Sequence, residues 1–133
     1  MESTLSNLFP NLSNRVHFRR IWWDIEEDIC LGCMGFGDAG NGQHSWTIDE
    51  EHSREIIKRA LELGMNFFDT AIAYQSGTSE QYVGRAVRNF AKREDVVVAT
   101  KFLPRTEDEI AAGVTGQQHI KRMLNTSLRN GDG

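Results

Sequence analysis

The sequence repeats one pattern three times between residues 29 and 130: a short apolar run, a loop, and a stretch whose apolar side chains recur with helical spacing. The apolar runs occupy residues 29–34, 65–69 and 96–100. Strands that alternate with amphipathic helices predict an α/β fold with a parallel sheet and right-handed crossovers. Three such units begin either an open doubly wound sheet or an eight-stranded barrel, and the pattern alone does not choose between them.

Local signals predict where the helices begin and which side chains they bury. Patterns typical of N-terminal capping boxes occur at Thr47 with Glu50, Thr78 with Gln81, and Thr115 with Gln118. Gly64 predicts the end of the first helix. The expected apolar stripes are Ile56, Ala60 and Leu63 beside Ile57 and Leu61, then Tyr82, Val83, Ala86, Val87 and Phe90, then Ile120, Met123, Leu124 and Leu128. Residues 102–114 are expected to form a loop, and residues 96–100 a strand buried on both faces.

Composition excludes several classes of protein. A hydrophobic fraction of 39% and a charged fraction of 26% are typical of a globular chain. The net charge of −4 provides no basic field that would attract nucleic acid. No apolar stretch approaches the roughly 20 residues of a membrane helix, and the chain does not begin with the apolar region of a secretory signal. We therefore expect a cytoplasmic protein without nucleic-acid or membrane partners.

The two parts of the chain differ in character. Residues 1–28 are expected to form an atypical N-terminal segment, and residues 29–133 the α/β unit. The N-terminal segment contains a basic and aromatic stretch, residues 15–23, of a type that contacts membrane surfaces or RNA. Acidic residues follow this stretch immediately, which disfavours that interpretation.

A glycine-rich stretch, GFGDAG at residues 35–40, has the G-x-G-x-x-G spelling of a dinucleotide-binding loop. That loop must open directly into a helix, but the next helix is expected to start only at Thr47. Asp69 also lies further along the chain than the ribose-binding acid of the motif. A Rossmann-like nucleotide binder is therefore the weaker alternative.

Cys30 and Cys33 spell C-x-x-C. A redox motif of this form lies at a helix N-terminus, whereas these residues lie in an expected strand. A zinc site would need a second pair of ligands, which the sequence lacks. We expect two buried structural cysteines and no metal.

Residues with acid–base chemistry follow two of the expected strands. Asp69 ends the second strand, Lys101 follows the third, and Tyr74 lies on the loop after Asp69. The carboxyl ends of parallel strands share one edge of a sheet, where α/β folds place their chemistry. A lysine charge favours the phenolate form of a nearby tyrosine, which makes that tyrosine a better proton donor. These three residues are the candidate catalytic group, although each taken singly has an ordinary structural explanation.

The segments GMNFFDTAIAY, SEQYVGRA and VVVATK resemble the aldo/keto reductase family, and LGCMGFG resembles the first strand and loop of its bacterial members. The resemblance runs from Ile29 to Asn130. It implies a (β/α)8 TIM-type barrel, of which this chain holds the first three βα units. It also implies NADP(H) as the cofactor and a small aldehyde or ketone as the substrate, with Trp46 contributing to the substrate pocket.

The resemblance also assigns roles to individual residues. Tyr74 would donate the proton, Lys101 would promote that donation, and Asp69 would orient Lys101. Gly35 and Phe36, on the first loop, would lie near the nicotinamide together with Asp69.

The sequence departs from the family in one important respect. The catalytic histidine of the family follows the fourth strand, and no fourth strand occurs in these 133 residues. The histidines present, at positions 17, 44, 52 and 119, match no position of that motif. Most residues that grip the adenosine phosphate also belong to later strands. We therefore expect these 133 residues alone to lack significant reductase activity and to bind NADP(H) poorly.

Two further interpretations follow from the partial length. The chain can be a non-catalytic interaction fragment that pairs with a complementary half-barrel or a full reductase, or the remnant of an interrupted gene. Open sheet edges would favour self-association. Light scattering separates these alternatives, because an interaction fragment gives a defined complex and a remnant gives a heterogeneous aggregate.

Overall fold

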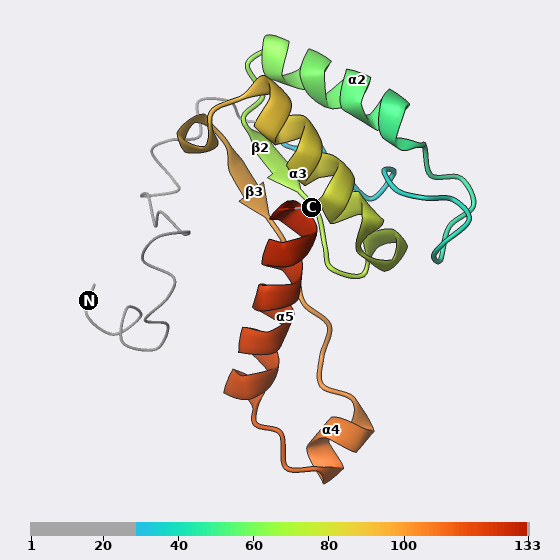
Figure 1. Cartoon of the computed structure of the whole chain (residues 1–133), viewed down its shortest axis with the longest axis vertical. Helices are drawn as coiled ribbons and strands as arrows, with labels where there is room; N and C mark the ends of the chain where they lie inside the picture. Colours follow the sequence, from blue (N-terminus) through green and yellow to red (C-terminus); the bar gives the residue numbers. More distant parts are fainter. Residues whose placement is uncertain (1–28, 133) are drawn as a thin grey trace.

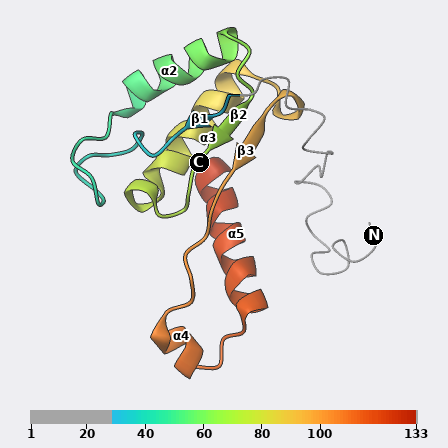
Figure 2. The same ribbon diagram turned by 180° about the vertical axis from the view of Figure 1, so that it is seen from behind.

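A computed structural model of the chain describes residues 29–132. Its three strands are β1 (Leu31–Gly32), β2 (Phe67–Asp69) and β3 (Val97–Ala99). They form one parallel sheet in the order β1-β2-β3, with Phe68 beside Leu31 on one side and Val98 on the other (Figure 2). The predicted parallel sheet is confirmed. Sequential order excludes the flavodoxin arrangement, in which the first strand lies between the second and third.

Helices cover one face of this sheet. The long helices are α2 (Glu50–Glu62), α3 (Thr78–Phe90) and α5 (Gly116–Asp132), and the short ones are η1 (Tyr74–Gly77), η2 (Arg93–Asp95) and α4 (Glu107–Ala111). Figure 1 shows α3 in front of the strands with α2 packed beside it at the top, while α5 contacts α3 and extends away from the sheet toward α4. Two consecutive helices on the same face are the result of right-handed crossovers between neighbouring parallel strands.

The core lies between β2 and the two helices α2 and α3. Phe68 is fully buried at its centre, with Ile57 of α2 and Val83 of α3 in the same cluster. Burial of a side chain of this size contributes about 1.5–3 kcal/mol. The core therefore fixes β2, the strand that ends in Asp69, more firmly than its neighbours.

The stripe predicted for α2 is confirmed at Ile57, Ala60 and the half-buried Leu61, but wrong at its two ends. Ile56 and Leu63 are 42% and 55% exposed, while Ile57, Ala60 and Ser53 are buried. The buried row includes a serine, whose hydroxyl donates to the backbone carbonyl of Asp49 at 2.6 Å. Counting apolar residues alone missed Ser53, because a serine satisfied in this way packs as a small residue. In α3 the predicted stripe is confirmed, with its central residues buried.

Two of the three predicted capping boxes are wrong. Asp49 rather than Thr47 caps α2, by accepting a hydrogen bond from the backbone N–H of His52 at 3.0 Å. Thr78 does not cap α3, because its hydroxyl donates to the carbonyl of Gln75 at 2.7 Å. Gly77 occupies the capping position instead.

The third predicted box, at the start of α5, is confirmed. The backbone N–H of Thr115 donates to the Gln118 side chain at 2.9 Å, and the backbone N–H of Gln118 donates back to the Thr115 hydroxyl at 3.2 Å. The predicted end of α2 is also confirmed, because Gly64 adopts a φ of 90° there.

The third strand is less buried than predicted. The residues of β3 are half-buried, and only Val96, just before the strand, is buried. Within residues 29–132, β1 and β3 each pair with a strand on one side only. Such edges attract other strands, so self-association remains a prediction. The division of the chain at residue 28 also remains a prediction, because residues 1–28, with the basic and aromatic stretch, lie outside the described range.

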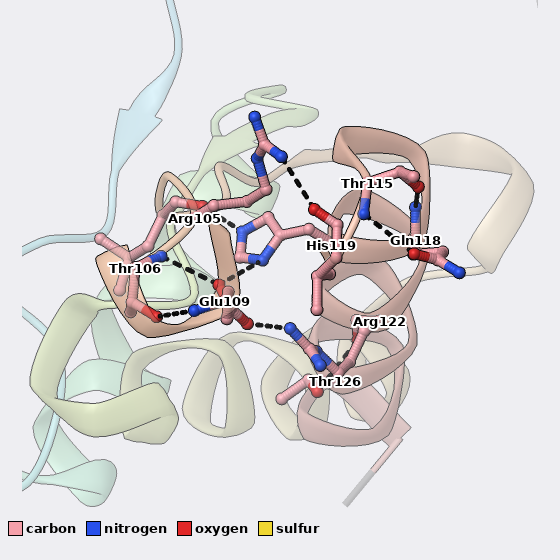
Figure 3. A network of polar contacts seen from close by, with 10 residues as sticks. Arg105, Thr106, Glu109, Thr115, Gln118, His119, Arg122 and Thr126 are labelled. Atoms are coloured by element: carbon pink, nitrogen blue, oxygen red, sulfur yellow. Dashed lines mark hydrogen bonds and ion pairs between the residues drawn. The ribbon is translucent and has the colours of Figure 1, made fainter. Parts of the chain in front are cut away.

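The segment predicted as a loop, residues 102–114, contains the short helix α4. Thr106 and Glu109 form a capping box there, which the sequence analysis missed. Figure 3 shows how α4 is tied to α5: the buried imidazole of His119 lies 2.6 Å from the carbonyl of Leu103 and 3.0 Å from Glu109, which also pairs with Arg122. In α5, Met123, Leu124 and Leu128 are only half-buried and Ile120 is exposed. None of the described helices is long and apolar enough to span a membrane.

Close packing of α3 against α5 depends on a glycine. A Cβ atom on Gly84 would collide with the backbone carbonyl of Gly131. We expect Gly84→Ala to lower the free energy of unfolding by about 1–3 kcal/mol, since backbone atoms cannot move aside as a flexible side chain can. Urea unfolding followed by circular dichroism measures this change. Gly116→Ala is the matched control, because its Cβ meets nothing within 4 Å; equal stability of the two variants would contradict the expectation.

Candidate active site

Asp69 and Lys101 meet at the carboxyl end of the sheet. Asp69 is the last residue of β2, and Lys101 follows β3 by two residues. The Nζ atom of Lys101 donates to both carboxylate oxygens of Asp69, at 2.8 and 2.7 Å, and to the carbonyl of Thr70 at 2.8 Å. The lysine ammonium therefore has three defined acceptors and a fixed position at the strand ends.

This ion pair remains accessible from solvent. The side chain of Lys101 is 50% exposed and that of Asp69 is 35% exposed. Burial lowers the pKa of Lys101, but the hydrogen bond and the charge of Asp69, with a smaller contribution from Tyr74, outweigh this effect and raise the pKa above its ordinary value. Lys101 is therefore a stable positive charge at the edge of the sheet where a ligand can approach.

Tyr74 completes the group. It is the first residue of η1, and its backbone N–H donates to the carbonyl of Ala71 at 3.1 Å, which turns the chain back after β2. The Nζ atom of Lys101 lies 5.2 Å from the centre of the half-buried Tyr74 ring. The three side chains singled out from the sequence are thus brought together, although Tyr74 lies five positions after Asp69 on a separate turn.

Buried polar side chains at the start of α3 support this edge of the sheet. Ser79 is fully buried and donates to the carbonyl of Cys33 at 2.7 Å. Its oxygen lies 3.1 Å from the hydroxyl of Thr70, which must act as the donor because the only hydroxyl hydrogen of Ser79 is already used. Ser79 therefore joins the ends of β1 and β2.

Glu80, the next residue, joins the third strand to the same helix. It is 4% exposed and accepts hydrogen bonds from the Thr100 hydroxyl at 2.6 Å and from the Asn130 side chain at 2.7 Å. Thr100 immediately precedes Lys101, so Glu80 helps to set where that lysine emerges. Neither Ser79 nor Glu80 was predicted from the sequence as part of the site. Their only signal was two polar residues in the first turn of an amphipathic helix, which solvent-exposed residues also produce.

The glycine-rich loop that follows β1 carries the remaining candidate residues. Ile48 donates its backbone N–H to the carbonyl of Gly35 at 2.9 Å, and Trp46 lies 3.9 Å from where a Cβ of Gly35 would be. Trp46 is 59% exposed and stacks on His44 with ring centres 4.8 Å apart. The ring of Phe36 is buried in the core, so this residue offers only its backbone to a ligand.

Neither alternative motif gains support from the structure. The G-x-G-x-x-G segment does not open into a helix, because α2 begins only at Glu50. Among residues 29–132, no cluster of histidine, cysteine and acidic residues has the arrangement of a metal site.

The two cysteines have different environments. Cys33 is buried as predicted, and burial, followed by the charge of Asp69, raises the pKa of its thiol to about 12. Cys33 is therefore an unreactive thiol. The prediction that Cys30 is also buried is wrong, since the strand β1 begins one residue later and leaves Cys30 exposed.

The described histidines have separate partners. His52 pairs with Asp49 at the start of α2, His44 stacks on Trp46, and His119 joins α4 to α5. His17 lies outside the described residues.

Comparison with known proteins identifies relatives of this arrangement. A family model described as the aldo/keto reductase family matches residues 28–132. An aryl-alcohol dehydrogenase of Pestalotiopsis microspora is 34% identical over 106 residues, which cover 76% of this chain and 27% of that protein. The aldo-keto reductase YhdN of Bacillus subtilis is 42% identical over 69 residues, which cover 51% of this chain and 21% of that protein. The chain thus spans about a quarter of the length of these relatives.

Solved structures give the same result. An aldo-keto reductase from Bacillus halodurans, in its holo form, superimposes with a TM-score of 0.58 and 31% identity, covering 79% of this chain and 32% of that one. An aldo-keto reductase from Klebsiella pneumoniae in complex with NADPH gives a TM-score of 0.55 and 25% identity, covering 77% of this chain and 30% of that one. The three βα units therefore correspond to part of a TIM-type barrel rather than to an open doubly wound sheet.

Proposed function

The chain belongs to the aldo/keto reductase family, and we propose that its 133 residues supply the proton-donating part of an NADP(H)-dependent carbonyl reductase. The observation that carries this proposal is the position of Lys101, which binds both oxygens of Asp69 while its Nζ atom lies 5.2 Å from the centre of the Tyr74 ring. A positive charge held beside a phenol promotes the donation of the phenol proton.

Each residue of the group has a role in this proposal. The hydroxyl of Tyr74 donates a proton to the carbonyl oxygen of the substrate as that oxygen becomes negative. Lys101 promotes the transfer, because a nearby positive charge stabilises the phenolate that remains on Tyr74. Asp69 keeps Lys101 charged and holds its side chain at the strand ends. Asp69 is therefore a positioning residue, and Tyr74 is the catalytic one.

The residues present fit one end of the cofactor. When bound, NADP(H) supplies the hydride that reaches the carbonyl carbon. The exposed pair of Lys101 and Asp69 is open to a flat polar ring such as nicotinamide, whereas the buried Phe36 ring is not. We propose Asp69 and Gly35 as contacts at that end, with Phe36 contributing its backbone alone.

The substrate class is proposed more broadly. Trp46, exposed near Gly35 and stacked on His44, provides an aromatic surface on the loop that Gln75 binds. Aromatic surfaces favour aromatic ligands through stacking. We propose small aldehydes or ketones as substrates and choose the aromatic 4-nitrobenzaldehyde as the test compound.

A chimeric barrel tests the proposed function. Residues 28–132 replace the matching segment of the Bacillus halodurans aldo-keto reductase, so that the remaining strands come from a complete enzyme. We expect this chimera to oxidise NADPH in the presence of 4-nitrobenzaldehyde. A folded chimera that binds NADPH but shows no turnover would contradict the proposal.

The 133-residue chain by itself is expected to show no significant turnover of 4-nitrobenzaldehyde. The reason is chemical: residues 29–132 contain no fourth strand, and in the family the catalytic histidine follows that strand. The measurement is the loss of NADPH absorbance with the purified chain, with the chimera as the positive control. NADPH-dependent turnover by the chain that Tyr74→Phe abolishes would overturn this expectation.

A further inference from the structure

Gln75, the residue after Tyr74, directs its side-chain hydrogen bonds to the loop of residues 38–47. Its side chain is 1% exposed. The Oε1 atom accepts a hydrogen bond from the backbone N–H of His44 at 2.9 Å, and the Nε2 atom donates to the carbonyls of Asp38 and His44, both at 2.8 Å. Nε2 also lies 3.2 Å from the hydroxyl of Thr47. A single buried amide thus binds both ends of residues 38–47.

The loop is shaped around this side chain. A Cβ atom on Gly37 would lie 2.5 Å from the Cβ of Gln75, and one on Gly42 would lie 2.7 Å from its Cα. No real Cβ contact is that short, so both glycines are needed for the loop to approach Gln75. The hydrogen bonds and the close packing are separate observations that indicate the same fit between loop and side chain.

The backbone at Gln75 also departs from ordinary values. Gln75 and Ser76 have φ values of 47° and 53°, in the left-handed region that residues other than glycine rarely adopt. Such a conformation persists only where surrounding contacts enforce it. Because the amide contacts lie on the loop, the loop enforces the turn on which Tyr74 sits.

We propose that Gln75 is a positioning residue for Tyr74, which couples the loop of residues 38–47 to the tyrosine ring beside Lys101. This inference rests on the proposed function, in which Tyr74 is the proton donor. Displacement of the loop, which carries the exposed Trp46, releases the turn after β2 and moves the ring away from the Lys101 ammonium. A ligand that contacts Trp46 therefore acts on the proton donor through Gln75.

Nuclear magnetic resonance of the labelled 133-residue chain tests the coupling with two readouts. The first is the hydrogen exchange of the His44 amide, which reports the hold of Gln75 on the loop. The second is the ring-current shift of the Lys101 ε-methylene group, which reports the Tyr74 ring, with Tyr74→Leu as the reference for its loss. Neither readout depends on turnover, so failure of this inference and failure of the proposed function are distinguishable.

The decisive variant is Gln75→Gly, which removes the amide while glycine tolerates the left-handed backbone without strain. We expect His44 exchange to accelerate at least about tenfold and the Lys101 shift to move toward its value in Tyr74→Leu. Gln117→Ala, at an exposed glutamine of α5, should change neither. Faster His44 exchange with an unchanged Lys101 shift would overturn the inference, because Gln75 would then hold the loop without affecting the position of the Tyr74 ring.

A second variant covers the case in which Gln75→Gly does not fold. Thr47→Val removes one partner of Gln75 from the loop side and leaves the sequence of the turn unchanged. It should shift both readouts in the same directions by smaller amounts. A Lys101 shift that stays constant while His44 exchange accelerates would again overturn the inference.

Discussion

Replacing Tyr74 with phenylalanine is expected to lower kcat of the chimeric reductase by about 10²–10⁴-fold, the usual contribution of a positioned proton donor. The substitution removes only the hydroxyl, and the remaining ring can still lie beside the Lys101 ammonium. KM for 4-nitrobenzaldehyde should change much less, because the hydroxyl acts mainly on the transition state. Steady-state kinetics with saturating NADPH measures both constants.

The second tyrosine of the chain provides the control. Tyr82 lies in α3, where its ring faces Arg85 at 5.6 Å, and burial, then nearby acidic charges, raise its pKa. Tyr82→Phe should leave kcat within about twofold of the unmodified chimera, as surface changes remote from a site usually do. Equal losses in the two variants would show that the proton comes from elsewhere or that the fold, not the chemistry, is affected.

The location of the site was predictable because it depends on chain order alone. Parallel strands place all their carboxyl ends on one edge, so Asp69 and Lys101 had to meet once the strands had been recognised. The register of β2 against β3, with Asp69 opposite Ala99, then brings Lys101 within reach. Neither step requires knowledge of side-chain packing.

Other parts were not predictable because they depend on contacts between distant loops. Thr47 and Thr78 have the spelling of helix caps, but their hydroxyls are used by Gln75, which lies on neither helix. Buried polar residues such as Glu80 look like surface residues in a sequence, since hydropathy does not reveal whether a partner is near. The candidate site residues could therefore be predicted from the sequence, whereas the buried polar residues that hold them in place could not.

Replacing Lys101 with methionine is expected to lower kcat of the chimera by about 10²-fold or more, because the charge that stabilises the Tyr74 phenolate is lost. Methionine keeps most of the length of the unbranched side chain and removes the ammonium. The control is Lys92→Met, at an exposed lysine before η2, which should have no effect on kcat. Retention of full activity in Lys101→Met would remove the basis of the proposed mechanism.

The same ion pair predicts a defined dependence on pH. Asp69 raises the pKa of Lys101 above its ordinary value of 10.5. Because the folded pKa exceeds the unfolded one, the contribution of the pair to stability is complete below the unfolded pKa and is lost as the pH rises through the folded pKa. In Asp69→Asn the carboxylate charge that raises the pKa is absent while burial still lowers it, so the pKa of Lys101 should fall and this alkaline loss should disappear. A titration of the Lys101 ε-methylene resonance in the 133-residue chain, from about pH 8 to about pH 12, measures the change. An unchanged pKa in Asp69→Asn would mean that Asp69 does not hold the charge on which Tyr74 is proposed to depend.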